Sequence, residues 1–304
     1  MHRIRNFALS RGGLMKRRAR AGLILLIAMG VSGCAMFETA EGPQERQEEE
    51  ALALDDFDPI DDTNLSEFMM SGADPDEAVA YFRRATQERP GRIDLERGLA
   101  TSLMRARQQS EGVSAWRRVV GMSGATSSDR VSYADAQIRT DDWEGAAATL
   151  AELPGGYESF ERHRLEALLA DSNENWDRAD QHYEAAVEMS DEPSGVLNNW
   201  GYSKLTRGEP EEAERLFREA LSADPGMFAA KNNLAMALGA QENYSLPMIE
   251  MTQEERARLT HTLALTALRQ NDLSTAQRLL QDAIDTHPRH FDEAVRALRI
   301  LEEA

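Results

Sequence analysis

Cysteine is almost absent from the 304-residue chain, which contains only Cys34. A single thiol excludes an internal disulfide framework and every zinc site that needs two thiolates. Aromatic residues make up 6% of the chain, which suits helices packed through small residues better than an aromatic-rich β-sandwich. Basic residues are also few, because 34 Lys and Arg stand against 53 Asp and Glu, for a net charge of −19. We therefore expect no nucleic-acid surface, which needs clustered cations.

The first 33 residues have the pattern of a secretion leader. Residues 1–20 are basic, and an apolar run of eleven residues, Ala21 to Val31, follows them. This run is roughly half of the ~20 residues that a helix needs to cross a bilayer. We therefore predict a signal peptide over residues 1–33 and no membrane span, with either Met1 or Met15 as the start.

The leader ends in Val31-Ser32-Gly33-Cys34, which resembles the lipobox of bacterial lipoproteins. The resemblance implies that the Cys34 thiol carries a lipid and becomes the N-terminus of the mature chain. An ordinary signal peptide followed by an unrelated cysteine is the alternative. Ala35 rather than Asp follows the cysteine, which by resemblance to lipoprotein sorting implies anchoring at the periplasmic face of the outer membrane.

Residues 34–58 are expected to form an acidic, disordered tether. Between Ala35 and Asp76 the sequence has fourteen acids and one base, Arg46. Low hydrophobicity combined with charge of one sign cannot offset the entropy of the chain. We interpret the segment as a spacer between the lipid and a folded domain, and binding of a basic partner is the alternative.

A repeat of about 34 residues runs through the rest of the chain. A small residue, a large apolar residue, a second small residue and a proline recur at spacings of 4, 3 and 5: Ala78, Phe82, Ala85 and Pro90; Ala213, Phe217, Ala220 and Pro225; Ala276, Leu280, Ala283 and Pro288. Looser copies begin at Gly112, Ala146 and Ala179. Positions i, i+4 and i+7 share one helix face, so the small residues allow a neighbouring helix to approach, and the proline ends the helix.

Candidate N-cap residues stand at the starts of these helices. A further small residue lies twelve positions before the first small residue of the motif, as Gly201 does before Ala213. The candidate caps are Asp74, Asn175, Glu209 and Asp272. Each repeat is therefore expected to be a hairpin of two helices.

This hairpin pattern resembles the tetratricopeptide repeat, and its best copy runs from Ser194 to Pro225. The resemblance implies an all-α superhelical solenoid over residues 59–304, with about seven hairpins and a C-terminal capping helix. Pro247 stands where the sixth repeat needs its small residue, so we expect an irregular unit at about residues 228–256. Glu166 stands at a position that is apolar in other repeats, which leaves the register of the fourth repeat open by one residue.

Catalytic motifs are missing: the sequence has no HExxH, GxSxG, P-loop or GxGxxG, and its one thiol is assigned to the lipid. We therefore predict no enzyme activity and no cofactor other than the lipid on Cys34. His287 and His290 flank Pro288 and could share a metal, but we interpret them as positive charge near a helix C-terminus and predict no metal site.

Tetratricopeptide arrays bind partners through the face formed by the first helix of each hairpin. The resemblance assigns eight residues to that face: Asn198, Asn199, Tyr202, Asn232, Asn233, Met236, His261 and Leu265. Side-chain amides both donate and accept, so they suit the backbone of a bound segment. The alternative is that Asn199 and Asn233 serve only hydrogen bonds between repeats. No cluster of Lys or Arg stands at the matching positions, so a clamp for a terminal carboxylate is not supported.

Four segments are most similar to the TadD family, the lipoproteins of the tight-adherence (Flp) pilus machinery: 197–205, 231–238, 246–248 and 251–257. The resemblance implies an adaptor that helps to assemble or localise the outer-membrane secretin through noncovalent binding of a secretin or another pilus-assembly component. The alternatives are a pilotin of another type IV pilus, a β-barrel assembly lipoprotein, and an adaptor for peptidoglycan hydrolases.

Overall fold

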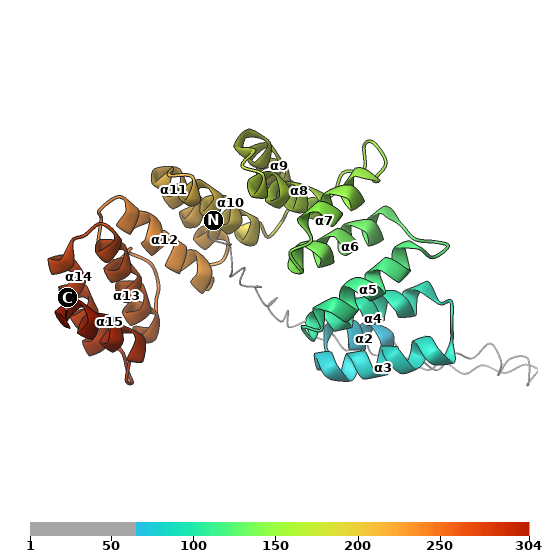
Figure 1. Cartoon of the computed structure of the whole chain (residues 1–304), viewed down its shortest axis with the longest axis horizontal. Coiled ribbons are helices and arrows are strands. Elements are labelled where there is room, and N and C mark those ends of the chain that lie inside the picture. Colours follow the sequence, from blue (N-terminus) through green and yellow to red (C-terminus); the bar gives the residue numbers. More distant parts are fainter. Residues whose placement is uncertain (1–64, 304) are drawn as a thin grey trace, which may run out of the picture. The chain divides into compact units, whose positions relative to one another are not determined.

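The computed structural model describes residues 65–303, and within them every regular element is a helix (Figure 1). The helices are α2 (Leu65–Ser71), α3 (Pro75–Glu88), α4 (Ile93–Arg105), α5 (Gln109–Val120), α6 (Ser127–Arg139), α7 (Trp143–Ala151), α8 (Phe160–Ser172), α9 (Trp176–Glu188), α10 (Ser194–Thr206), α11 (Pro210–Ala223), α12 (Phe228–Ala240), α13 (Gln253–Arg269), α14 (Leu273–Thr286) and α15 (Asp292–Glu303). The predicted all-α solenoid is confirmed. The predictions for the leader, Cys34 and the tether lie outside these residues.

The described residues fall into two compact units that divide at Gly124. The N-terminal compact unit contains α2 to α5, in which α4 packs against both α3 and α5. The C-terminal compact unit contains α6 to α15, with tight pairs α6/α7, α8/α9, α10/α11 and α13/α14. Between residues 65 and 303, no helix is long and apolar enough to cross a membrane.

The helices follow the predicted repeat. Six units have two helices in the order α2/α3, α4/α5, α6/α7, α8/α9, α10/α11 and α13/α14. The sixth of the seven units has only α12, because residues 241–252 form no helix, and α12 packs directly on α13. Helix α15 packs on α14 at the position expected for a capping helix.

The repeat motif accounts for the packing within each unit. Its small and large apolar members are all buried except Leu153, which is partly buried. A Cβ on Gly201 would lie 2.7 Å from Cε1 of Phe217, so the glycine is what lets α10 approach α11. Pro90, Pro225 and Pro288 each stand two residues after a helix end, as predicted. Ala167 and Ala179 are both fully buried, so the register of the fourth unit is the one expected from the repeat.

The turns inside the hairpins show the repeat in the backbone itself. From the second repeat to the seventh, one residue of the turn after the first helix has a left-handed conformation: Arg107, Asp141, Glu174, Gly208, Glu242 and Asn271. These positions are spaced 34, 33, 34, 34 and 29 residues apart. Glu242 makes this turn even though no second helix follows it.

Two of the four expected caps are confirmed. Asp74 accepts hydrogen bonds from the backbone amides of Asp76 and Glu77, and Asp272 accepts one from the amide of Thr275. Asn175 and Glu209 stand at N-cap positions but make no capping hydrogen bond through their side chains. The Glu209 carboxylate instead accepts from Lys204 at 2.9 Å, which explains why it does not cap.

Candidate functional site

The eight predicted groove residues lie on the first helices of three successive units. Asn198, Asn199 and Tyr202 belong to α10, Asn232, Asn233 and Met236 to α12, and His261 and Leu265 to α13. All are half-buried except Asn198, which is 8% exposed.

Hydrogen bonds connect these residues from one unit to the next. The Nδ2 amide of Asn233 donates to Oδ1 of Asn198 at 2.9 Å, and the Thr262 hydroxyl donates to Oδ1 of Asn232 at 2.7 Å. Asn198 and Asn232 therefore both use their oxygen as an acceptor between units. The Nδ2 of Asn232 has only a long contact of 3.8 Å to the sulfur of Met236, which is a weak acceptor, so this amide can donate to a bound carbonyl.

Asn232 and His261 share a cavity of about 370 Å³ near the end of the C-terminal compact unit. Helices α12 and α13 line one part of it, and the segment from His287 into α15 lines another. The lining residues are Phe228, Asn232, Glu254, Arg258, His261, Thr262, His287, His290, Phe291 and Glu293. We call this the C-terminal pocket.

Aromatic rings hold the C-terminal pocket in shape. The Phe291 ring lies 4.7 Å from the His287 ring, nearly parallel to it, and 5.2 Å from the His261 ring. The Arg258 guanidinium sits over the Phe228 ring at 5.4 Å. Burial lowers the pKa of His261, although Glu293 acts in the opposite direction, so the neutral imidazole is favoured there. The pocket thus offers flat apolar faces beside an amide donor.

This chemistry suits binding better than catalysis. The hydroxyl of Thr262 donates to Asn232 and to the Arg258 carbonyl, and no histidine activates it. His287 contacts the Arg289 carbonyl through Nδ1 at 2.8 Å, whereas His290 pairs with Asp292 at 3.1 Å, so these two histidines do not converge. Across residues 65–303, no group of three His, Cys, Asp or Glu side chains is placed to hold a metal ion.

Sequence reasoning found only part of the C-terminal pocket. It assigned Asn232 and His261 to the binding face, named His287 and His290 only as positive charge near a helix end, and missed Phe228, Arg258 and Phe291. The spacing that placed His261 on the binding face also places Arg258 there, one helical turn earlier, and could have found it. Phe291 lies beyond the last repeat and has no such signal. The other six predicted groove residues do not line this pocket.

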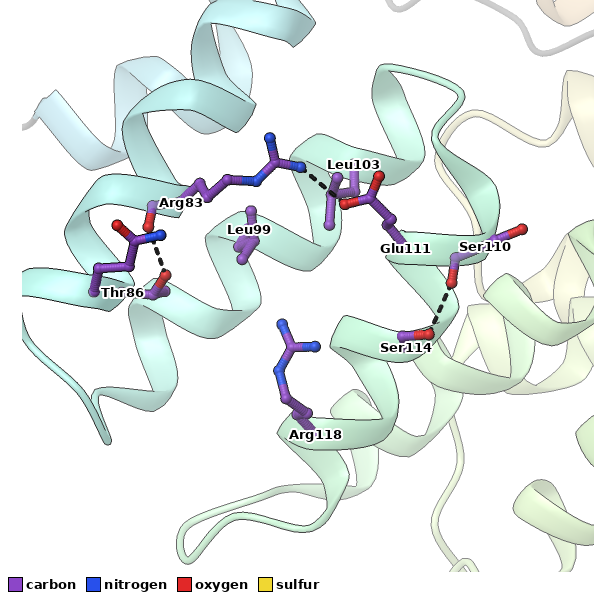
Figure 2. A pocket seen from close by; sticks show the side chains of 9 residues that line it. Arg83, Thr86, Leu99, Leu103, Ser110, Glu111, Ser114 and Arg118 are labelled. Atoms are coloured by element: carbon purple, nitrogen blue, oxygen red, sulfur yellow. Dashed lines mark hydrogen bonds and ion pairs between the residues drawn. The ribbon is translucent and has the colours of Figure 1, made fainter.

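A second cavity, of about 550 Å³, lies in the N-terminal compact unit between α3 and α5 (Figure 2). Leu99 and Leu103 of α4 form its floor, and the Arg83 guanidinium reaches toward Glu111, with which it pairs at 2.9 Å. The Ser114 hydroxyl donates to the Ser110 carbonyl of its own helix. Most polar groups that line this cavity have hydrogen-bond or ion-pair partners nearby, and none of the predicted site residues lines it.

Comparison with known proteins shows which fold this is. The model of a tetratricopeptide-repeat family matches residues 198–246, and no curated protein matches the sequence. The chain is similar to a crystal structure of the APC/C hetero-tetramer Cut9-Hcn1 at 13% identity and a TM-score of 0.57, over 83% of this chain and 51% of that chain. It therefore spans about half the length of that structure's chain.

Two other solved structures cover more of their own length. A tetratricopeptide repeat protein from Parabacteroides merdae has 16% identity and a TM-score of 0.54, over 79% of this chain and 96% of that one. PilW, a widely conserved type IV pilus biogenesis factor, has 12% identity and a TM-score of 0.55, over 74% of this chain and all of that one. Together with the family match over residues 198–246 and the hairpins described above, these likenesses show that the chain has the tetratricopeptide-repeat fold.

Proposed function

We propose that this protein is an outer-membrane-anchored lipoprotein that acts as an adaptor in Flp (Tad) pilus assembly and assists assembly or localisation of the secretin. Three features support the proposal. The sequence has a lipobox-like segment that ends at Cys34, and its repeats are similar to the TadD family. Its fold is one that proteins use to bind other proteins, and PilW, a pilus biogenesis factor, has the same fold.

The C-terminal pocket is the observation that carries the binding role. Its open Nδ2 donor on Asn232 can bind a backbone carbonyl of a partner segment, and the Phe228 and Phe291 rings can pack against an apolar side chain. The binding is noncovalent. The lipid on Cys34 would keep the protein at the membrane, and the acidic tether would let the pocket reach the partner.

The anchor is tested by affinity purification of the tagged, membrane-solubilised full chain beside a Cys34→Ala form, with partners identified by mass spectrometry. We expect a secretin and other pilus components with the wild-type chain and a marked loss of them with the Cys34→Ala form. Recovery of β-barrel assembly factors or cell-wall hydrolases in their place would overturn the pilus role and leave the fold unaffected.

The predicted binding face is tested with the double variant Asn198→Asp/Asn232→Asp, in which Asn232 lines the C-terminal pocket and Asn198 lies on the first helix of the preceding repeat. Aspartate keeps the oxygens that accept from Asn233 and Thr262, so the array should stay folded. It removes both amide donors and adds two negative charges, so recovery of the partner should fall about 10-fold or more, which corresponds to the loss of one hydrogen bond to a charged or buried group.

A matched control is Asn243→Asp/Asn271→Asp. These asparagines lie in exposed turns, do not line the C-terminal pocket, and give the same change in charge. Equal recovery of the partner with both double variants would show that the partner does not bind through these asparagines of the predicted binding face.

A further inference from the structure

A pair of histidines bridges the two helices of the fourth unit, far from the C-terminal pocket in sequence. His163 lies on α8 and His182 on α9, and their Nδ1 atoms are 2.9 Å apart. Their side chains are 12% and 18% exposed, so the pair is largely desolvated but reachable from solvent. The sequence analysis did not predict this close pair of histidines.

The outer nitrogen of each ring faces a carboxylate. Nε2 of His163 contacts Glu158, whereas Nε2 of His182 accepts a hydrogen bond from Nε of Arg178 at 3.4 Å and lies 3.9 Å from Glu166. The Glu158 carboxylate fixes the orientation of the His163 ring and makes its inner nitrogen a better ligand, as the usual outer-shell partner of a metal-bound histidine does. Glu166 can take the same part for His182 once Arg178 turns away from Nε2.

Proton accounting shows what the inner nitrogens share. With His163 protonated at Nε2 toward Glu158, its Nδ1 is an acceptor, and the Nδ1 of His182 must donate to it. A single proton therefore joins two neutral rings, and it occupies the place where two nitrogen lone pairs can meet.

We propose that His163 and His182 form a two-histidine site for a divalent transition metal that prefers imidazole, such as Zn²⁺. The metal takes the place of the shared proton, which moves to Nε2 of His182 and points toward Glu166. The Arg178 Nε–H, which donates to that nitrogen at 3.4 Å, must then turn away, and its side chain is 55% exposed. With Zn–N bonds of ~2.0–2.1 Å, a separation of 2.9 Å corresponds to an angle of about 90° at the metal, and opening to a tetrahedral angle requires the nitrogens to move apart to roughly 3.3 Å. Water fills the remaining positions.

The surrounding charges are balanced and leave room for a cation. Arg178 pairs with Glu166 at 2.6 Å and Arg162 with Glu158 at 3.2 Å, so each guanidinium beside the pair has an acidic partner. The other histidine pair in the described part of the chain, His287 and His290, has its nitrogens on separate partners. This difference makes that pair a suitable control.

The test is titration of Zn²⁺ into the tag-free full chain at pH 7.5, after chelator treatment, by isothermal calorimetry, with Co²⁺ absorbance as a second probe. We expect one ion per chain. His163→Gln and His182→Gln should each abolish binding, and His287→Gln/His290→Gln should leave it unchanged. Glu158→Gln keeps both rings and should weaken binding 10- to 100-fold. Metal binding by imidazole is pH-dependent, so the affinity should fall when the titration is repeated at pH 5.5.

Absence of binding to the wild-type chain, or binding that survives in both single histidine variants, would overturn the site. Circular dichroism of each variant shows whether it is folded. If a histidine variant loses its helical signal, Glu158→Gln decides, and an unchanged affinity in that variant counts against the proposal. None of these outcomes depends on the adaptor role, so the two proposals fail separately.

Discussion

Gly201 shows how much a single hydrogen atom in place of a methyl group matters in this array. A Cβ on it would meet the Phe217 ring of α11, and a Cβ on Gly98 of α4 would meet the Phe82 ring of α3, so both glycines allow close contact between helices. Gly195 stands on the same helix as Gly201, and a Cβ there would meet nothing within 4 Å. The same substitution should therefore have opposite effects at two positions of α10.

We expect Gly201→Ala to lower the free energy of unfolding by about 1–3 kcal/mol, because the new methyl group forces Phe217 out of its packed position. Gly195→Ala should raise it by about 0.4–1 kcal/mol, because alanine restricts the unfolded chain at no steric cost. Urea denaturation followed by circular dichroism measures both. A loss of similar size in the two variants would contradict the packing argument.

The histidines predict how stability depends on pH. Burial lowers the pKa of His182, with the His163 ring and the Arg178 and Arg162 guanidiniums acting in the same direction and Glu166 in the opposite one. His182 is therefore harder to protonate in the folded state than in the unfolded state. Its contribution to the free energy of unfolding is complete above the pKa of an unfolded histidine, near 6.5, and is lost as the pH falls below that value. The melting temperature should be lower at pH 5.5 than at pH 7.5.

His182→Gln should reduce this difference, whereas His290→Gln, a change on the exposed side chain beside Asp292, should not. Two other groups shape the profile. His261, whose pKa burial also lowers, adds to the loss, and Asp171, whose pKa burial raises, opposes it. A pH profile that is the same in wild type and His182→Gln would show that this ring does not contribute.

At the scale of elements, α2 and the residues just after it make hydrogen bonds to two other helices, one between Ser66 and Tyr81 of α3 and three from Arg105 of α4. No residue of α2 is buried, and Phe68 is 57% exposed. Arg105 of α4 donates to the carbonyls of Met69, Met70 and Ala73, at and just beyond the end of α2. A cation at the C-terminus of a helix also complements the helix dipole.

We expect Arg105→Ala to release α2 while α3 to α5 remain folded. Hydrogen exchange measured by mass spectrometry should show faster exchange of the 65–71 amides, by a factor of about 10, and little change elsewhere. Arg83→Ala, which breaks the exposed pair with Glu111, is the control and should leave α2 unchanged. Unchanged exchange in α2 after removal of Arg105 would show that other contacts hold it.

The elements themselves were predictable because their determinants are local. The small and large apolar residues of the motif, the prolines and the caps at Asp74 and Asp272 all lie within one hairpin, so the sequence spacing reports them directly. The C-terminal pocket was only half predictable, because Phe291 approaches His261 from beyond the last repeat. The histidine pair was not predictable, because two residues 19 positions apart meet only after α8 and α9 have packed.

At the scale of the whole molecule, the junction between the fourth and fifth units is held by polar groups. Asp180 of α9 accepts hydrogen bonds from Trp200 Nε1 at 2.6 Å, from Lys204 at 3.0 Å and from Arg207, all on or next to α10. The Arg207 side chain is 5% exposed and also lies over the Trp176 ring. Stability passes from one repeat to the next through such junctions.

We expect Asp180→Ala to cost about 2–4 kcal/mol, because it leaves the buried Arg207 without one of its acidic partners. It should also separate the melting of the units on either side, so that a calorimetric transition becomes broader. Glu212→Ala, which removes the exposed partner of Arg215, is the control and should cost less than about 1 kcal/mol. A single sharp transition with an unchanged midpoint would rule out the coupling role of Asp180.

The left-handed turns are positions at which substitution by glycine should stabilise this chain. Of the six turn positions only Gly208 is a glycine, and the other five carry side chains in a conformation that costs roughly 1–2 kcal/mol for most L-residues and less for Asn and Asp. The turns lie in separate units, so their effects should add. A version of this protein with glycine at several of these turns should therefore tolerate damaging substitutions in its binding face that the natural sequence cannot, which makes it the better background for changing what the array binds.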